Sequence, residues 1–189
     1  MQTMVKPQTK TLLTAVDLYQ MPDHGGRTEL VKGEVTPMSP AGTQHGKIAA
    51  RLGRYIGNYV EDNNLGEVYA AETGFTIEED PDTVRAPDVS FVDRERIPPE
   101  GEPPGFWAIA PDLVAEVLSP FDVASKVQQK ITEYLQAGVR LVWLVDPETQ
   151  TVTVYESLAH GRILLPDDTL TGGEVLPGFS LPLRQLFRR

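Results

Sequence analysis

Residues 112–147 constrain the fold more than any other part of the sequence. Two apolar segments, "DLVAEVLS" (112–119) and "VRLVWLVDP" (139–147), flank a segment in which apolar side chains recur at helical spacing. The second segment is apolar on both faces, which is typical of a strand inside a sheet. A helix between two neighbouring strands is a crossover connection, so these strands are predicted to be parallel. The chain is therefore predicted to be an α/β protein.

Further elements precede this unit. A helix is predicted over 45–64, where apolar side chains again recur at helical spacing. Strands are predicted at "GEVYAAETGFTI" (66–77) and "VRAPDVSFV" (84–92), with the acidic stretch "EEDPD" as the turn between them. From residue 45 onward the predicted order is helix, three strands, helix and strand around a mixed β-sheet.

The N-terminal part is predicted to extend this core. Thr14 and Asp17 have the spacing of a capping box, which predicts a short helix. The segment "RTELVKGEVTPMSP" predicts a hairpin that turns at Lys32-Gly33. Residues 1–10 are expected to be a disordered lead-in, and 11–189 a single domain.

Two details concern the C-terminal half. Ser119 or Asp122 is expected to cap the crossover helix. The segment "GEVLPGFSLPLRQLF" (173–187) predicts a short strand and a final turn. The apolar side chains expected to pack there are Phe179, Leu183, Leu186 and Phe187.

Charge and composition narrow the possible functions. The formal net charge is −10, and more than half of the acidic residues lie in 61–120. This distribution suits a metal site better than a general patch for polyanions. The chain has no cysteine, which excludes disulfides and thiolate chemistry. No apolar run is long enough for a membrane span, and the N-terminus lacks a secretory pattern, so a cytoplasmic protein without membrane partners is expected.

Two carboxylates lie within apolar strand segments. Asp88 follows Pro87, and Glu116 lies among Val, Ala and Leu. An isolated buried carboxylate is costly, but two on neighbouring strands can share a divalent cation such as Mg²⁺. Pro87 would stop ladder pairing and leave Asp88 accessible. The alternative is that both carboxylates face solvent or pair with Arg85 and Arg140, and spacing alone leaves this open.

An ordered set of motifs resembles a known family. The segments are "APDVSFV", "PDLVAEVLSP", "KITEYLQAGVRLVWLVDPETQTVTVY" and "LPGFSLPL", with "ELVKGEVTPMSPAGTQHGKIAARL" upstream. Together they resemble the Uma family of restriction-endonuclease-like proteins, within the PD-(D/E)XK nuclease superfamily. The resemblance spans roughly residues 11–187. It implies a restriction-endonuclease-like core of helix, three strands, helix and strand, which is the order predicted above.

The resemblance also implies a site. Asp88 matches the aspartate of the Pro-Asp motif and Glu116 the acidic residue of (D/E)XK, both as metal ligands and catalytic residues for Mg²⁺ or Mn²⁺. Leu118 stands where a plain (D/E)XK motif places its lysine. In this family the lysine is expected on the following helix, which suggests Lys130, with Lys126 one turn earlier as the alternative. Without the resemblance, Lys130 would be a solvated helix lysine.

Three further residues are candidates. The resemblance places Glu34 at the site as an additional metal ligand or water-binding carboxylate, although it could equally be an exposed hairpin residue. His45 could orient a phosphate or a water, or cap the helix that it begins. Glu72 is the third acidic candidate, and a surface strand residue is the favoured interpretation there.

The function implied is hydrolysis of DNA phosphodiester bonds by a metal-activated water, with DNA as the partner. A homodimer is expected, because nucleases that cut both strands often pair two sites, and the final apolar segment is one candidate surface. The alternative is a catalytically inactive nuclease-fold module for binding or assembly. The acidic charge of the chain and its lack of a basic recognition helix favour that alternative. The joint presence of Asp88, Glu116 and Lys130 argues against it.

Overall fold

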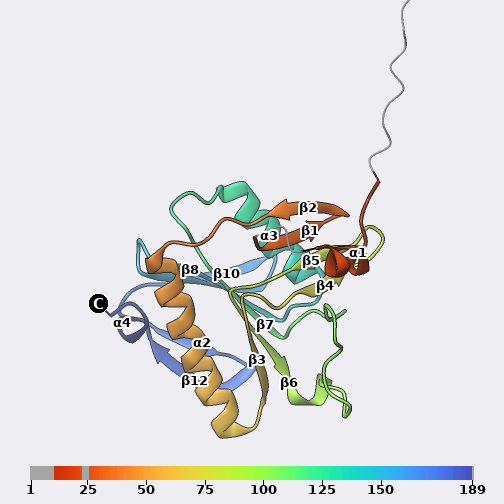
Figure 1. The fold of residues 1–189 in the computed structure, drawn as a ribbon. Coiled ribbons are helices and arrows are strands. Elements are labelled where there is room, and N and C mark those ends of the chain that lie inside the picture. Colours follow the sequence, from red (N-terminus) through yellow and green to blue (C-terminus); the bar gives the residue numbers. More distant parts are fainter. Residues whose placement is uncertain (1–10, 23–25, 189) are drawn as a thin grey trace, which may run out of the picture.

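A six-stranded mixed sheet forms the centre of the computed structural model, which describes residues 11–22 and 26–188 (Figure 1). The expected lead-in, 1–10, lies outside the described residues. The strand order is β10-β9-β8-β7-β6-β3. The strands are β3 (Gly66–Ala70), β6 (Val89–Asp93), β7 (Leu113–Val117), β8 (Leu141–Asp146), β9 (Thr151–Ser157) and β10 (His160–Leu164). β7 and β8 are parallel, as the crossover predicted, and the other pairs are antiparallel.

Helix α2 (Thr43–Asn63) covers one face of this sheet. Its buried side chains Ile48, Leu52, Ile56 and Val60 recur every four residues and pack on one stripe. The helix ends at Asn64, whose φ of 54° is the left-handed conformation common at a helix C-terminus. This confirms the predicted helix to within two residues.

Helix α3 (Ala124–Gln136) covers the opposite face. Its buried Ile131 and Tyr134 pack on Val114 and Val142, whereas Leu113 of β7 packs on the α2 side. The predicted capping by Ser119 or Asp122 is wrong. The helix begins after Val123, and the Asp122 carboxylate instead accepts a bond from the Ser119 amide within the preceding loop.

A second, four-stranded sheet has the order β2-β1-β5-β4. Its strands are β1 (Thr28–Val31), β2 (Glu34–Pro37), β4 (Phe75–Glu78) and β5 (Thr83–Arg85). The predicted hairpin turns at Lys32-Gly33, where both residues have positive φ. The predicted capping box of Thr14 and Asp17 begins α1 (Ala15–Gln20), and Figure 1 shows the hairpin on the same side of the molecule as α3.

The expectation that 66–77 and 84–92 are single strands is wrong. Each segment divides between the two sheets, the first into β3 and β4 and the second into β5 and β6. Pro87, which has no N–H for a ladder, lies where the chain passes from one sheet to the other. Asp88 therefore lies immediately before β6 and not in the middle of a strand.

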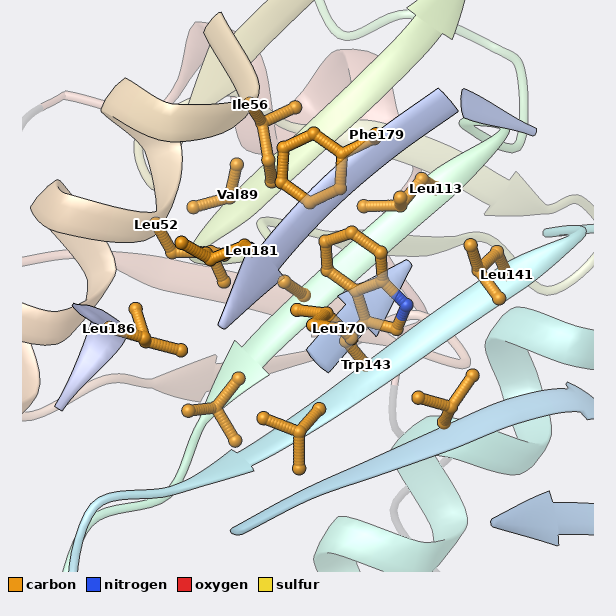
Figure 2. Packing of buried hydrophobic residues seen from close by; sticks show 14 of the residues in the cluster. Leu52, Ile56, Val89, Leu113, Leu141, Trp143, Leu170, Phe179, Leu181 and Leu186 are labelled. Atoms are coloured by element: carbon orange, nitrogen blue, oxygen red, sulfur yellow. The ribbon is translucent and has the colours of Figure 1, made fainter. Parts of the chain in front are cut away.

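The C-terminal segment completes the core on the α2 side. It forms β11 (Thr169–Gly172), β12 (Leu176–Pro182) and α4 (Leu183–Leu186). Trp143 stacks on Phe179 with ring centroids 5.7 Å apart, and Figure 2 shows both rings among residues of α2, β7 and β12. The predicted apolar side chains of this segment are buried, so they do not supply the exposed dimer surface that the sequence suggested.

A short 3₁₀ helix, η1 (Arg94–Arg96), follows β6. No helix in the described ranges is long and apolar enough to cross a membrane.

Candidate active site

Asp88 is held between the end of β7 and the start of α2. Its Oδ2 accepts a hydrogen bond of 2.9 Å from the Val117 amide and lies 3.0 Å from His45 Nε2. Burial raises the pKa of Asp88, but the His45 and Val117 bonds outweigh it and keep the pKa below its ordinary value. The carboxylate is therefore ionised in the neutral range.

Glu116 lies one residue before Val117 and faces α3. Its Oε1 accepts a hydrogen bond of 2.6 Å from the Tyr134 hydroxyl and lies 2.9 Å from Lys130 Nζ. Burial raises the pKa of Glu116; Asp88 raises it further and Lys130 opposes the shift. Asp88 thus bonds the backbone at Val117, the residue directly after Glu116, so the two carboxylates that the sequence singled out lie at the same end of β7.

Lys130 lies between two carboxylates. Its Nζ is 2.9 Å from Glu116 Oε1 and 3.1 Å from Glu29 Oε1, and its side chain is only 16% exposed. Burial lowers the pKa of Lys130, but Glu116 and Glu29 outweigh burial and raise it. Lys126 is exposed and makes no ion pair with the described residues. Of the two lysines left open by the sequence, Lys130 is the one that contacts Glu116.

Glu29 of β1 is a member of this cluster that the sequence reasoning missed. Its side chain is 2% exposed, and it accepts bonds from Arg85 Nη1 at 2.6 Å and from the Ala86 amide at 3.1 Å. Arg85 also pairs with Glu133 of α3. The sequence could have indicated Glu29, because this glutamate directly precedes the apolar residues Leu30 and Val31. Glu116 was identified from the same feature, a carboxylate among apolar strand residues.

The arginines expected as alternative partners have other roles. Arg85 pairs with the two glutamates above, and Arg140 lies near Asp112. Asp88 and Glu116 are 9% and 14% exposed, respectively, so the solvent-facing alternative is wrong as well. Both carboxylates instead contact other residues of one cluster.

The other predicted residues are placed as follows. His45 lies in the first turn of α2, where its contact is with Asp88 and no side-chain cap bond forms. The bond to Asp88 raises the pKa of His45, against the opposing effect of burial. Glu34 is exposed on β2 opposite Val31, outside the contacts of Lys130 and the two catalytic candidates. Glu72 is exposed, as favoured, but it lies in the turn after β3 and not in a strand.

The donor set was compared with what a divalent cation requires. Within the described ranges, no three His, Asp or Glu side chains form a ready metal-binding group. However, the bonds of Asp88 all use Oδ2 and those of Glu116 all use Oε1, which leaves one oxygen of each without a partner among the described residues. Neither oxygen is among the fully buried unpartnered atoms. Two hard carboxylate oxygens with access to water fit Mg²⁺ or Mn²⁺, which keep several water ligands.

Comparison with known proteins gives the family. The model of the Uma2 family, described as "Putative restriction endonuclease", matches residues 15–184. The chain belongs to the Uma2 family. The matched range of Uma2 includes Glu29, Asp88, Glu116 and Lys130, so the whole cluster lies inside the family domain.

A solved structure supports the same fold. The chain is similar to the crystal structure of "a putative nuclease belonging to DUF820" from Anabaena variabilis ATCC 29413, with a TM-score of 0.81 and 25% sequence identity. The similarity covers 93% of this chain and 97% of that chain. The α/β fold with a mixed sheet is thus a nuclease-like fold. No curated protein matches the chain.

Proposed function

We propose that this Uma2-family chain is a metal-dependent endonuclease that hydrolyses DNA phosphodiester bonds. The observation that carries the proposal is the juxtaposition of Asp88, Glu116 and Lys130 in a family described as "Putative restriction endonuclease". Asp88 and Glu116 would hold Mg²⁺ or Mn²⁺, and Glu34 stays a predicted additional ligand. When bound, the cation activates water and neutralises charge that develops on the phosphoryl group.

Lys130 supplies a fixed positive charge beside the carboxylates. Its ammonium is held by Glu116 and Glu29, and their charges keep it protonated. A preorganised cation of this kind positions an attacking water or offsets the negative charge that grows on the phosphate. Lys126, one turn earlier on α3, is exposed and does not share these contacts.

His45 orients Asp88 from outside the carboxylate pair. It lies 3.0 Å from Oδ2, the oxygen that also accepts the Val117 bond. These two contacts hold Oδ2, so Oδ1 is the oxygen that would be available to a cation. Contacts of this type orient metal ligands and tune their affinity.

The test is metal binding and DNA cleavage by matched variants. Asp88→Asn and Glu116→Gln preserve shape and remove one charge each, and Glu156→Gln changes an exposed carboxylate of β9 as the control. Calorimetry with Mn²⁺ should lose binding in the first two variants only, and cleavage of plasmid and of single-stranded DNA should fall about a hundredfold or more. Undiminished cleavage by folded Asp88→Asn would overturn the proposal.

The second candidate is a catalytically inactive module that binds DNA or assembles with a partner. The net charge of −10 argues against a nuclease that approaches duplex DNA and favours the assembly role, because duplex DNA repels a surface of this sign. DNA binding in EDTA, without hydrolysis when Mg²⁺ or Mn²⁺ is added, would support this candidate over the nuclease.

A further inference from the structure

A cavity of about 530 Å³ lies beside the candidate active site, between the first half of α2 and the end of β3. His45 and Asp88 line it, so it adjoins the carboxylate at which cleavage is proposed. The other lining residues include Arg27, Glu72 and four small residues of α2. This volume is within the range of small-molecule sites, and a cavity of this size can hold one nucleotide unit.

The cavity exists because α2 carries very small residues toward β3. Ala49 and Ala50 are each three or four positions from both Gly46 and Gly53, so the four residues lie on one side of the helix. At Gly53 a Cβ would be 3.5 Å from Val89, so the helix and sheet touch there. At Gly46 a Cβ would meet nothing within 4 Å, so the space is open next to His45.

The cavity wall combines apolar surface with groups of both charges. Arg27 is half-buried, and its Nη2 donates to the carbonyls of Ala71 and Ala86. Its Nε and Nη1 have no partner within the described part of the chain. Glu72 and Asp88 add carboxylate acceptors. A phosphate would meet these negative charges, whereas a nucleobase has a flat apolar surface and a neutral edge with donors and acceptors.

We propose that the cavity binds an unstacked base of the DNA strand, next to the phosphodiester bond that is cleaved. This inference rests on the nuclease function proposed above and names its substrate class. A base in a duplex is paired and stacked and does not reach a recessed cavity without being extruded. The preferred substrate is therefore single-stranded DNA, or DNA with an unpaired nucleotide at the cleaved position.

The charge of the molecule supports a base-binding cavity. A chain with net charge −10 gains little from phosphate neutralisation, which supplies most of the affinity of general DNA-binding proteins. Contact with the faces of bases adds affinity for single strands beyond that of phosphate contacts. A site for one base next to Asp88 would provide this affinity and would also position the strand at the proposed cleavage site.

Gly46→Leu tests the inference, with Gly57→Leu as its matched control. Both glycines lie in α2 where a Cβ meets nothing within 4 Å, and only Gly46 lines the cavity. Leucine favours a helix over glycine, so both variants are expected to fold. Ala50→Leu is a second filling variant at an exposed lining position.

The measurement is fluorescence anisotropy of a labelled oligonucleotide, single-stranded or annealed as a blunt duplex, in EDTA and in Ca²⁺. We expect wild type and Gly57→Leu to bind the single strand at least tenfold more tightly than the duplex. Gly46→Leu and Ala50→Leu should lose that preference. Equal binding of both DNA forms, no binding of the single strand in either buffer, or unchanged binding by both filling variants would overturn the inference.

The binding assay, together with a cleavage assay on the same oligonucleotides, separates this inference from the nuclease proposal. Binding that depends on Gly46 but is followed by no hydrolysis with Mg²⁺ or Mn²⁺ would support the base cavity and reject the nuclease. Metal-dependent cleavage with equal activity on duplex and single strand, unchanged in Gly46→Leu, would support the nuclease and reject the base cavity.

Discussion

At the scale of single residues, the site depends on charges that neutralise each other inside the protein. Lys130 lies between Glu116 and Glu29, and Arg85 lies between Glu29 and Glu133. Removal of one member of such a buried set leaves an uncompensated charge, which costs far more than the loss of a surface ion pair. The cluster is therefore expected to be sensitive to single substitutions.

Lys130→Gln tests the assigned lysine. The substitution removes the ammonium and keeps a hydrogen-bond donor near Glu116, so cleavage should fall about a hundredfold while Mn²⁺ binding persists. Lys126→Gln, one turn away and exposed, is the control and should cleave like wild type. Equal losses of activity in the two variants would contradict the assignment. The measurement is initial cleavage rate together with calorimetry.

Glu29 should make stability depend on pH. Burial raises the pKa of Glu29, but Lys130 and Arg85 outweigh it and hold the pKa below its ordinary value of 4.5. Glu116 and Glu133 face the same two cations from β7 and α3. Because the unfolded chain binds this proton at higher pH than the folded chain, the contribution to stability is complete above pH 4.5 and decreases as pH falls through the lower folded pKa.

Urea unfolding of wild type and Glu29→Gln at several pH values measures this dependence. Glu29→Gln should be less stable than wild type at neutral pH, because it leaves buried cations without a partner. Wild type should lose stability below pH 4.5 more steeply than this variant, because only wild type has the Glu29 carboxylate that takes up a proton there. Glu156→Gln, at an exposed position, should follow wild type. Parallel curves for wild type and Glu29→Gln would contradict the pKa direction assigned to Glu29.

At the scale of elements, local sequence predicted what depends on local pattern. The parallel pair β7–β8 was predictable because its apolar segments flank a helix, and Asp88 and Glu116 stood out as charges among apolar neighbours. The division of two predicted strands between two sheets was not predictable, because it depends on pairing with segments that are distant in the sequence. Glu29 was missed for the same reason, since it meets Arg85 only after the hairpin docks beside β5.

The hairpin that carries Glu29 should be sensitive at its turn. Gly33 has a φ of 76°, and a Cβ there would be 2.6 Å from Leu12 Cβ. Gly101 has a φ of 89° with nothing within 4 Å, so Gly101→Ala isolates the backbone strain of about 1 kcal/mol. Gly33→Ala should cost at least a further ~1 kcal/mol from overpacking in urea unfolding. Equal losses in the two variants would show that Leu12 moves away without cost.

At the scale of the whole molecule, the acidic surface and a DNA substrate must be reconciled. Since few phosphates can be neutralised, single-strand binding should weaken less than about tenfold between roughly 50 and 200 mM salt. The measurement is anisotropy across that range, with Gly57→Leu as a control that keeps the cavity. A loss of a hundredfold or more would indicate many phosphate contacts and contradict binding mainly through a base.

The expected oligomeric state depends on whether the substrate is duplex or single-stranded DNA. A homodimer was expected because cutting both strands of a duplex requires two sites. A single-stranded substrate removes that requirement, and one chain with one base cavity is then sufficient. Sedimentation equilibrium with and without oligonucleotide measures the oligomeric state. A monomer that cleaves single strands would agree with the cavity proposal. A dimer that is required for cleavage would agree with the expectation of a duplex-cutting enzyme.

The location of Lys130 on α3 has a consequence for the newly synthesised chain. In a plain (D/E)XK arrangement the lysine follows the acidic residue on the same strand, whereas here that position is Leu118. The ammonium reaches Glu116 only after residues 124–136 have formed a helix and packed on β7 and β8. The proposed nuclease site would therefore be complete only after α3 has packed on the sheet.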